Sequence, residues 1–139
     1  MKKKITAMIF ALILCLCAVT PAFAANSDGF VGECNRLNDA ANLLTDSEKA
    51  ELLAKLDEIS LRQQMDVTVA TVTNLGNCDT AAECADEVYE FSGFGYGQSK
   101  DGLMLLISAE EHDWAISTCG YGITAFTDAG IEYIGRQMK

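Results

Sequence analysis

The hydrophobic positions between residues 35 and 75 predict one helix followed by one strand. Leucine and isoleucine recur at helical spacing over residues 46–63, which predicts an amphipathic helix. Thr45 and Glu48 have the spacing of a capping box, in which the threonine hydroxyl caps the first turn and the glutamate reaches back. Residues 66–73 (DVTVATVT) are mostly β-branched, and both of their faces are apolar or small, as in a strand covered on both sides.

The next segment predicts a second helix. Thr80 and Glu83 repeat the capping-box spacing. The face that this helix would turn inward consists of Ala81, Cys84, Ala85 and Val88. A glycine-rich connection (GFGYG, residues 93–97) follows it.

The last third of the chain predicts a hairpin and a third helix. Residues 102–109 (GLMLLISA) and 114–119 (WAISTC) are β runs joined by a short polar turn, which is the pattern of a hairpin. Gly120-Tyr121-Gly122 interrupts the pattern, and Thr127 caps a last helix with Ile131 and Ile134 facing inward.

The order helix, strand, helix, strand, strand, helix predicts an α/β fold with a mixed sheet and helices on its faces. The last predicted helix has no glycine, proline or polar tail to end it before Lys139. We therefore expect a fragment, or a chain that lacks a C-terminal segment.

The first 24 residues have the three parts of a secretory signal peptide in the right order. Lys2 to Lys4 are basic, residues 5–19 are uncharged and mostly apolar, and Ala22-Phe23-Ala24 offers small residues for cleavage. A retained membrane anchor is the alternative, but the apolar run is short for a span, which needs about 20 residues. We expect cleavage after Ala24, a short leader over residues 25–34, and one domain over residues 35–139.

The balance of charge is strongly acidic. Loss of the three leading lysines would take the formal net charge from −10 to −13. Such a surface repels nucleic acid and anionic lipid headgroups, and it suits divalent cations, basic partners or simply solubility.

Four cysteines remain after the predicted cleavage, and an even number in an exported chain suggests disulfides. Cys78 and Cys84 are close in sequence and are the first expected pair, which leaves Cys34 with Cys119. Free buried thiols are the alternative.

Three aspartates precede or follow predicted elements and are candidate metal ligands. Asp39 precedes the first helix, Asp101 precedes a buried strand, and Asp128 opens the last helix. In α/β sheets ligands gather where strands end and helices begin, so these acids could converge on a cation such as Ca²⁺. The alternative is that Asp101 and Asp128 only stabilise a turn and a helix cap.

The sequence offers little for nucleophilic catalysis. His112 is the only histidine, and the pattern places it in the hairpin turn. The glycine-rich residues 93–97 lack the lysine and hydroxyl residue of a phosphate-binding loop. No catalytic residue is therefore assigned.

These segments together resemble the TPM domain family, which includes thylakoid-lumen phosphatase-like proteins and exported bacterial proteins. Residues 37–44 (LNDAANLL) resemble the opening segment of the family. Residues 101–106 (DGLMLL) resemble its Asp-Gly strand start, and residues 118–128 (TCGYGITAFTD) resemble its Gly-Tyr-Gly turn with a following Thr-Asp pair.

The resemblance implies an α/β/α sandwich on a central mixed sheet and an acidic pocket for a divalent cation, with Asp39, Asp101 and Asp128 assigned by position. It leaves two main functions open. One is a cation-binding accessory module that contacts other cell-envelope proteins, with a membrane span only in a missing C-terminal segment. The other is a metal-assisted phosphatase, for which Arg36 and Arg136 are the candidate phosphate ligands. A purely structural secreted domain is the third alternative.

Overall fold

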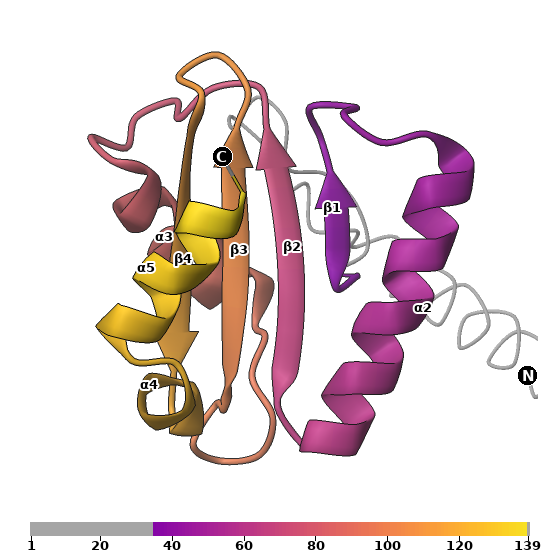
Figure 1. Cartoon of the computed structure of the whole chain (residues 1–139), viewed down its shortest axis with the longest axis vertical. Coiled ribbons are helices and arrows are strands. Elements are labelled where there is room, and N and C mark those ends of the chain that lie inside the picture. Colours follow the sequence, from indigo (N-terminus) through magenta and orange to yellow (C-terminus); the bar gives the residue numbers. More distant parts are fainter. Residues whose placement is uncertain (1–34, 139) are drawn as a thin grey trace, which may run out of the picture.

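A four-stranded mixed sheet forms the centre of the molecule (Figure 1). The structure is a computed structural model that describes residues 35–138. The predicted signal peptide, the leader and Cys34 lie outside the described residues. The elements in chain order are β1 (Leu37–Asp39), α2 (Asp46–Gln63), β2 (Asp66–Val72), α3 (Ala81–Ser92), β3 (Gly102–Ser108), β4 (Asp113–Cys119), α4 (Tyr121–Ala125) and α5 (Asp128–Gln137).

The strands lie in the order β1-β2-β3-β4. β1, β2 and β3 are parallel to one another, and β4 returns antiparallel to β3 as the second strand of the predicted hairpin. α2 and α5 lie on one face of the sheet and α3 lies on the other (Figure 1). The predicted α/β/α sandwich with a mixed sheet is therefore confirmed. Among the described residues, none of the helices combines the length and apolarity that a membrane span needs.

Within residues 35–138, six of the eight elements were predicted, and they begin within a residue or two of the predicted starts. The sequence pattern missed β1, because a strand of three residues is too short to show a period. Its pairing with β2 is visible only in the fold. It also missed α4. Gly120 makes the expected break, with a φ of 57°, but a short helix begins at Tyr121.

The helix caps are only partly as predicted. Thr45 and Glu48 form the complete capping box at the start of α2. At α3 the Thr80 hydroxyl accepts the Glu83 N–H at 3.1 Å as expected, but the Glu83 carboxylate accepts the N–H of Asp79 rather than that of Thr80. The Glu83 side chain therefore reaches one residue further back than in a capping box.

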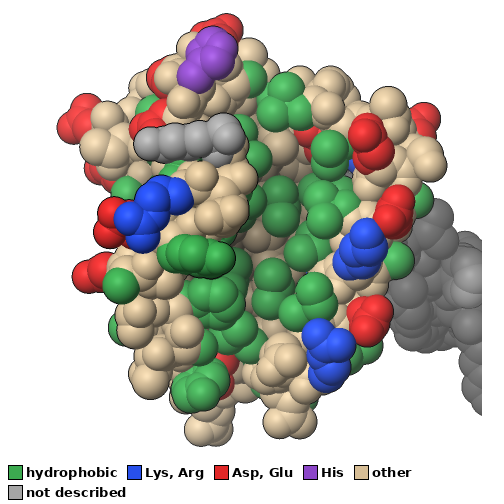
Figure 2. Space-filling view, viewed as in Figure 1, with side chains coloured by type: hydrophobic (Ala, Val, Ile, Leu, Met, Phe, Trp, Pro, Cys, Tyr) green, Lys and Arg blue, Asp and Glu red, His purple; other side chains and the backbone are tan. Residues whose placement is uncertain are grey.

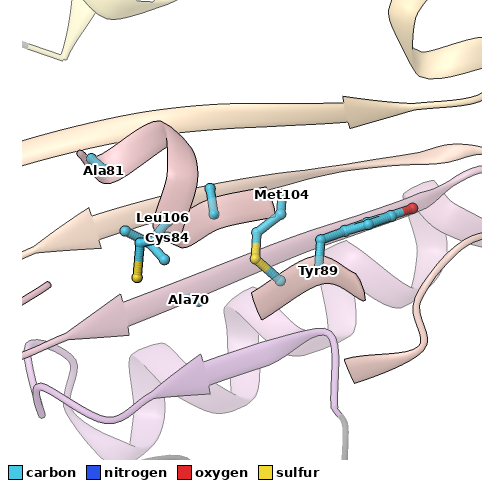
Figure 3. Close-up of a cluster of buried hydrophobic side chains, with 7 residues drawn as sticks. Ala70, Ala81, Cys84, Tyr89, Met104 and Leu106 are labelled. Atoms are coloured by element: carbon cyan, nitrogen blue, oxygen red, sulfur yellow. The ribbon is translucent and has the colours of Figure 1, made fainter. Parts of the chain in front are cut away.

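The main hydrophobic core lies between the sheet and α3 (Figure 3). It contains the predicted inner face of α3 and the alternate residues of β2 and β3 that point to that side. Tyr89, which the pattern did not single out, is also buried there. The buried members of the cluster are Ala70, Ala81, Cys84, Ala85, Tyr89, Met104 and Leu106.

The opposite face of the sheet is more open. Val69, Leu105 and Ile107 point to this side and are only half-buried. Figure 2 shows hydrophobic side chains in the hollow between α2 and α5. α5 reaches the sheet through Gly135, which is buried against the ring of Trp114 on β4. The predicted inward residues of this helix, Ile131 and Ile134, are half-buried.

The contact of Gly135 with Trp114 is testable, because a Cβ at Gly135 would overlap the indole ring. We expect Gly135→Ala to destabilise the protein by about 1–3 kcal/mol through overpacking. We also expect a change in the emission of Trp114, the only tryptophan in the chain. Urea unfolding followed by fluorescence measures both effects.

Gly130→Ala is the matched control in the same helix. A Cβ there would have its nearest neighbour at 3.6 Å, which is ordinary contact. Alanine should stabilise the helix by up to about 0.5–1 kcal/mol. Equal effects of the two substitutions would contradict the packing of α5 described above.

Candidate functional site

The three aspartates predicted to bind a metal do not form one cluster. Asp39 pairs with Thr71 near the end of β2, whereas Gly102, which follows Asp101, pairs with the first residue of β2. At roughly 3.3 Å per residue, about 16 Å of strand separates the two positions. Within residues 35–138, no three acidic, histidine or cysteine side chains gather closely enough to hold a metal ion. Asp128 is exposed in the first turn of α5.

Asp39 organises the loop between β1 and α2. One carboxylate oxygen accepts the Leu43 N–H at 2.9 Å and the Thr71 hydroxyl at 2.5 Å. The other accepts the Leu44 N–H at 3.0 Å and lies 3.2 Å from the Lys49 ammonium. The side chain is only 2% exposed. Each oxygen thus has two donors, and a metal ion would have to displace them.

These donors change the acidity of Asp39. Burial alone would raise its pKa, but the hydrogen bonds from Thr71, Leu44, Leu43 and Lys49 outweigh it and lower the pKa to about 2. Because the folded state binds this proton more weakly, the stabilisation is complete above about pH 4. It is lost as the pH falls through about 2.

We expect Asp39→Asn to lower the free energy of unfolding by about 2 kcal/mol at pH 7, since an amide has one acceptor oxygen in place of two. Urea midpoints at pH 7 and pH 2.5 test this. The wild type should lose more stability than the variant on acidification. Asp128→Asn, which changes an exposed carboxylate, should behave like the wild type at both pH values.

The second predicted ligand, Asp101, lies at the opposite edge of the sheet. This edge is formed by strand ends, where β2 and β3 begin and β4 ends. We call this edge, with the loop over residues 93–101 and the turn over residues 120–122, the glycine-rich end. Asp101 Oδ1 accepts the Tyr121 N–H at 2.6 Å, which ties the start of β3 to the start of α4. Its other carboxylate oxygen receives no hydrogen bond from the described residues.

Backbone segments approach one another closely at the glycine-rich end. A Cβ at Gly102 would overlap the Tyr89 hydroxyl and stand 2.7 Å from the Asp66 carbonyl oxygen. A Cβ at Gly122 would overlap the Gly102 carbonyl oxygen. At Gly120 it would overlap Asp101 Oδ1. The Gly-Tyr-Gly motif is therefore required because α4 begins in direct contact with the backbone of β3.

Sequence reasoning missed Asp66, which is also part of this end. Its Oδ1 accepts two hydrogen bonds from the Arg36 guanidinium, the shorter at 2.8 Å, and its Oδ2 accepts the Gly95 N–H at 2.8 Å. Arg36 also reaches Asp57 on α2 at 2.7 Å. The sequence did offer one sign of this role, since Asp66 is an acid at the start of an otherwise apolar strand. A carboxylate at such a position needs a partner.

The other candidate polar residues, Arg36, Arg136 and His112, are engaged with side chains or backbone of the protein itself. Arg36 is occupied by Asp57 and Asp66, and Arg136 lies 3.4 Å from Glu132 on the same helix. His112 is exposed in the hairpin turn, as predicted, and its ring nitrogen lies 3.1 Å from the Glu110 carbonyl oxygen.

The described cysteines are free thiols in the structure. Cys84 is buried on α3, and Cys78 packs against the same core cluster from the preceding loop. The predicted partners therefore lie together without a bond between them. Cys119 packs at the edge of the cluster, and its predicted partner Cys34 lies outside the described residues, so that pairing stays a prediction.

Comparison with known families agrees with this geometry. Residues 37–139 match the TPM domain family, and the match includes both the Asp39 loop and the glycine-rich end. The chain belongs to the TPM domain family. The resemblance stated from the Asp-Gly and Gly-Tyr-Gly segments is thus confirmed. No curated protein matches the chain.

Solved structures share the TPM fold. The N-terminal domain of a P. gingivalis protein superposes with a TM-score of 0.64 at 19% identity, covering 76% of this chain and 66% of that one. The N-terminal domain of a Corynebacterium glutamicum protein gives 0.55 at 19% identity, with 81% and 68% covered. The chain thus spans about two thirds of the length of each. At this identity the likeness shows the fold.

The close packing of the Gly-Tyr-Gly turn in this TPM domain gives a further prediction. Gly120→Ala would place a Cβ 2.5 Å from the Ser99 carbonyl oxygen and against Asp101, at a φ that alanine disfavours. We expect a loss of about 2–4 kcal/mol in the free energy of unfolding.

Gly97→Ala provides the control for backbone strain alone. Gly97 has a φ of 67°, but nothing lies within 4 Å of a Cβ placed there. It should cost about 1 kcal/mol. Chemical denaturation of both variants compares them, and equal losses would show that the contact with Asp101 contributes nothing.

Proposed function

We propose that this TPM domain is an accessory module of the cell envelope that binds a divalent cation weakly at the glycine-rich end. The observation that carries the proposal is the state of Asp101, whose carboxylate has one oxygen on the Tyr121 N–H and one without a hydrogen-bond partner among the described residues. Its partners would be proteins of the envelope, which an acidic surface attracts through basic patches.

The location rests on the sequence. A basic start, an apolar run and an Ala-Phe-Ala site make residues 1–24 a signal for export. Outside the cytoplasm calcium-binding modules work with dissociation constants of about 0.1–1 mM, so a site with few protein ligands is sufficient there.

The ligands available near Asp101 support a weak site. The Gly120 backbone lies close to both the Asp101 carboxylate and the Ser99 carbonyl oxygen. One carboxylate with neighbouring carbonyl oxygens and water is a ligand set for a hard cation. The proposal narrows the three-aspartate prediction to Asp101, because Asp39 lies at the other edge with its oxygens occupied. Phosphatase activity stays a prediction of the family resemblance.

Calcium titration followed by amide NMR tests the proposal. We expect saturable shifts with a dissociation constant of about 0.1–1 mM, concentrated around Asp101, Gly120 and Tyr121. Asp101→Asn should abolish them, while its amide oxygen still accepts the Tyr121 N–H and keeps the turn folded.

Two variants serve as controls. Asp39→Asn and Asp128→Asn should leave the calcium shifts unchanged if Asp101 is the ligand. Loss of binding in either one would favour the original assignment of three ligands. The absence of saturable shifts in the wild type up to 10-fold above the expected constant would overturn the proposal.

A further inference from the structure

The loop before α3 and the first turns of that helix bring two thiols together. Cys78 lies two residues before Thr80, the residue that caps α3, and Cys84 lies within the helix. Cys84 is 7% exposed and belongs to the buried cluster, and Cys78 is half-buried against that cluster. The Cys78 sulfur also lies 3.7 Å from the carboxylate of Glu87, which is on α3 three residues beyond Cys84.

Backbone hydrogen bonds hold both cysteines in place. The Cys78 N–H donates to the Leu75 carbonyl oxygen at 3.1 Å, and the Cys84 N–H donates to the Thr80 carbonyl oxygen at 3.1 Å. Their positions are thus fixed by the turn and by the helix cap, so both thiols are held against the same buried cluster before any bond forms.

We propose that Cys78 and Cys84 are a dithiol pair that oxidises to a disulfide, which clamps the loop after β2 to the start of α3. The inference goes beyond the proposed function and is independent of calcium binding. It also selects this pair over one between Cys84 and Cys119. Cys119 pairs with Gly102, which lies against the Tyr89 hydroxyl, and Tyr89 is five residues, or about 7.5 Å of helix, beyond Cys84.

The bond forms by thiol–disulfide exchange with an external disulfide, for which oxidised glutathione is the probe. The more accessible Cys78 sulfur attacks one glutathione sulfur and releases one glutathione thiol. Cys84 then attacks the Cys78 sulfur and releases the second glutathione. The two protein thiols lose two protons and two electrons, and the glutathione disulfide takes up both as two thiols.

The surroundings of Cys78 predict a slow reaction with this probe. Its sulfur lies 3.7 Å from a Glu87 carboxylate oxygen. Burial, followed by the neighbouring Cys84 and Glu87, raises the pKa of the Cys78 thiol to about 12, so little thiolate is present at pH 7. Cystamine, a positively charged disulfide, should therefore react faster than the anionic glutathione disulfide.

Trypsin makes the product simple to identify. No lysine or arginine occurs between residues 63 and 99, so one tryptic peptide, residues 63–100, contains Cys78 and Cys84 and no other cysteine. After equilibration of the full chain with oxidised glutathione and alkylation, we expect this peptide to be unalkylated and two hydrogens lighter than its reduced form. A link from this peptide to one containing Cys34 or Cys119 would overturn the proposal. So would full alkylation of both thiols.

Thermal unfolding shows whether the bond acts as a clamp. The oxidised wild type should melt about 5–10 °C above the reduced protein, as expected for closure of a short loop. Cys119→Ser should keep this redox-dependent shift, and Cys78→Ser should lose it. If Cys78→Ser does not fold, the shift in the wild type with and without reductant decides. An oxidised protein that melts no higher than the reduced one would contradict the clamp.

Discussion

The packing of the glycine-rich end depends on the absence of a side chain at Gly102. Two neighbours occupy the space that a Cβ at Gly102 would need: the Tyr89 hydroxyl from α3 and the Asp66 carbonyl oxygen from β2. The carbonyl oxygen of Gly102 in turn occupies the space that a Cβ at Gly122 of α4 would need. Tyr89 also donates its hydroxyl to the Lys100 carbonyl oxygen at 3.2 Å. Two helices and two strands therefore meet at one residue of backbone. Because α4 is held there, Asp101 meets the Tyr121 N–H, and the candidate site is a consequence of this packing.

Carboxylates in this domain stabilise the backbone at both edges of the sheet, but to different extents. Asp39 receives donors on both oxygens and is almost fully buried, so it behaves as part of the loop it organises. Asp66 is similarly occupied by Arg36 and Gly95. Asp101 is half-buried and gives only one oxygen to the backbone. A carboxylate oxygen without a hydrogen-bond donor distinguishes a candidate metal ligand from a structural carboxylate, whereas the number of acids does not.

The long elements were predictable because each repeats a pattern over at least seven residues with its own start signal. β1 and α4 were not, since three and five residues carry no period and their conformation follows from contacts made far along the chain. The three aspartates were expected to converge, but the direction of the strands keeps Asp39 and Asp101 apart. Asp39 ends a strand and Asp101 precedes one, so in a parallel arrangement they must lie at opposite edges. The sequence contains both residues but not the pairing of β1 with β2, and that pairing decides their separation.

α3 extends from the two thiols to the glycine-rich end. Its first turns hold Cys84 beside Cys78, close to where β2 ends, and its last turns bring Tyr89 to Gly102 at the glycine-rich end. The inner face of the helix is small or apolar, so it packs closely on Ala70, Met104 and Leu106 with little room for rotation (Figure 3). At the other end of the helix the Tyr89 hydroxyl donates to the carbonyl oxygen of Lys100, the residue before Asp101. Tyr89 therefore joins α3 to the backbone of the glycine-rich end.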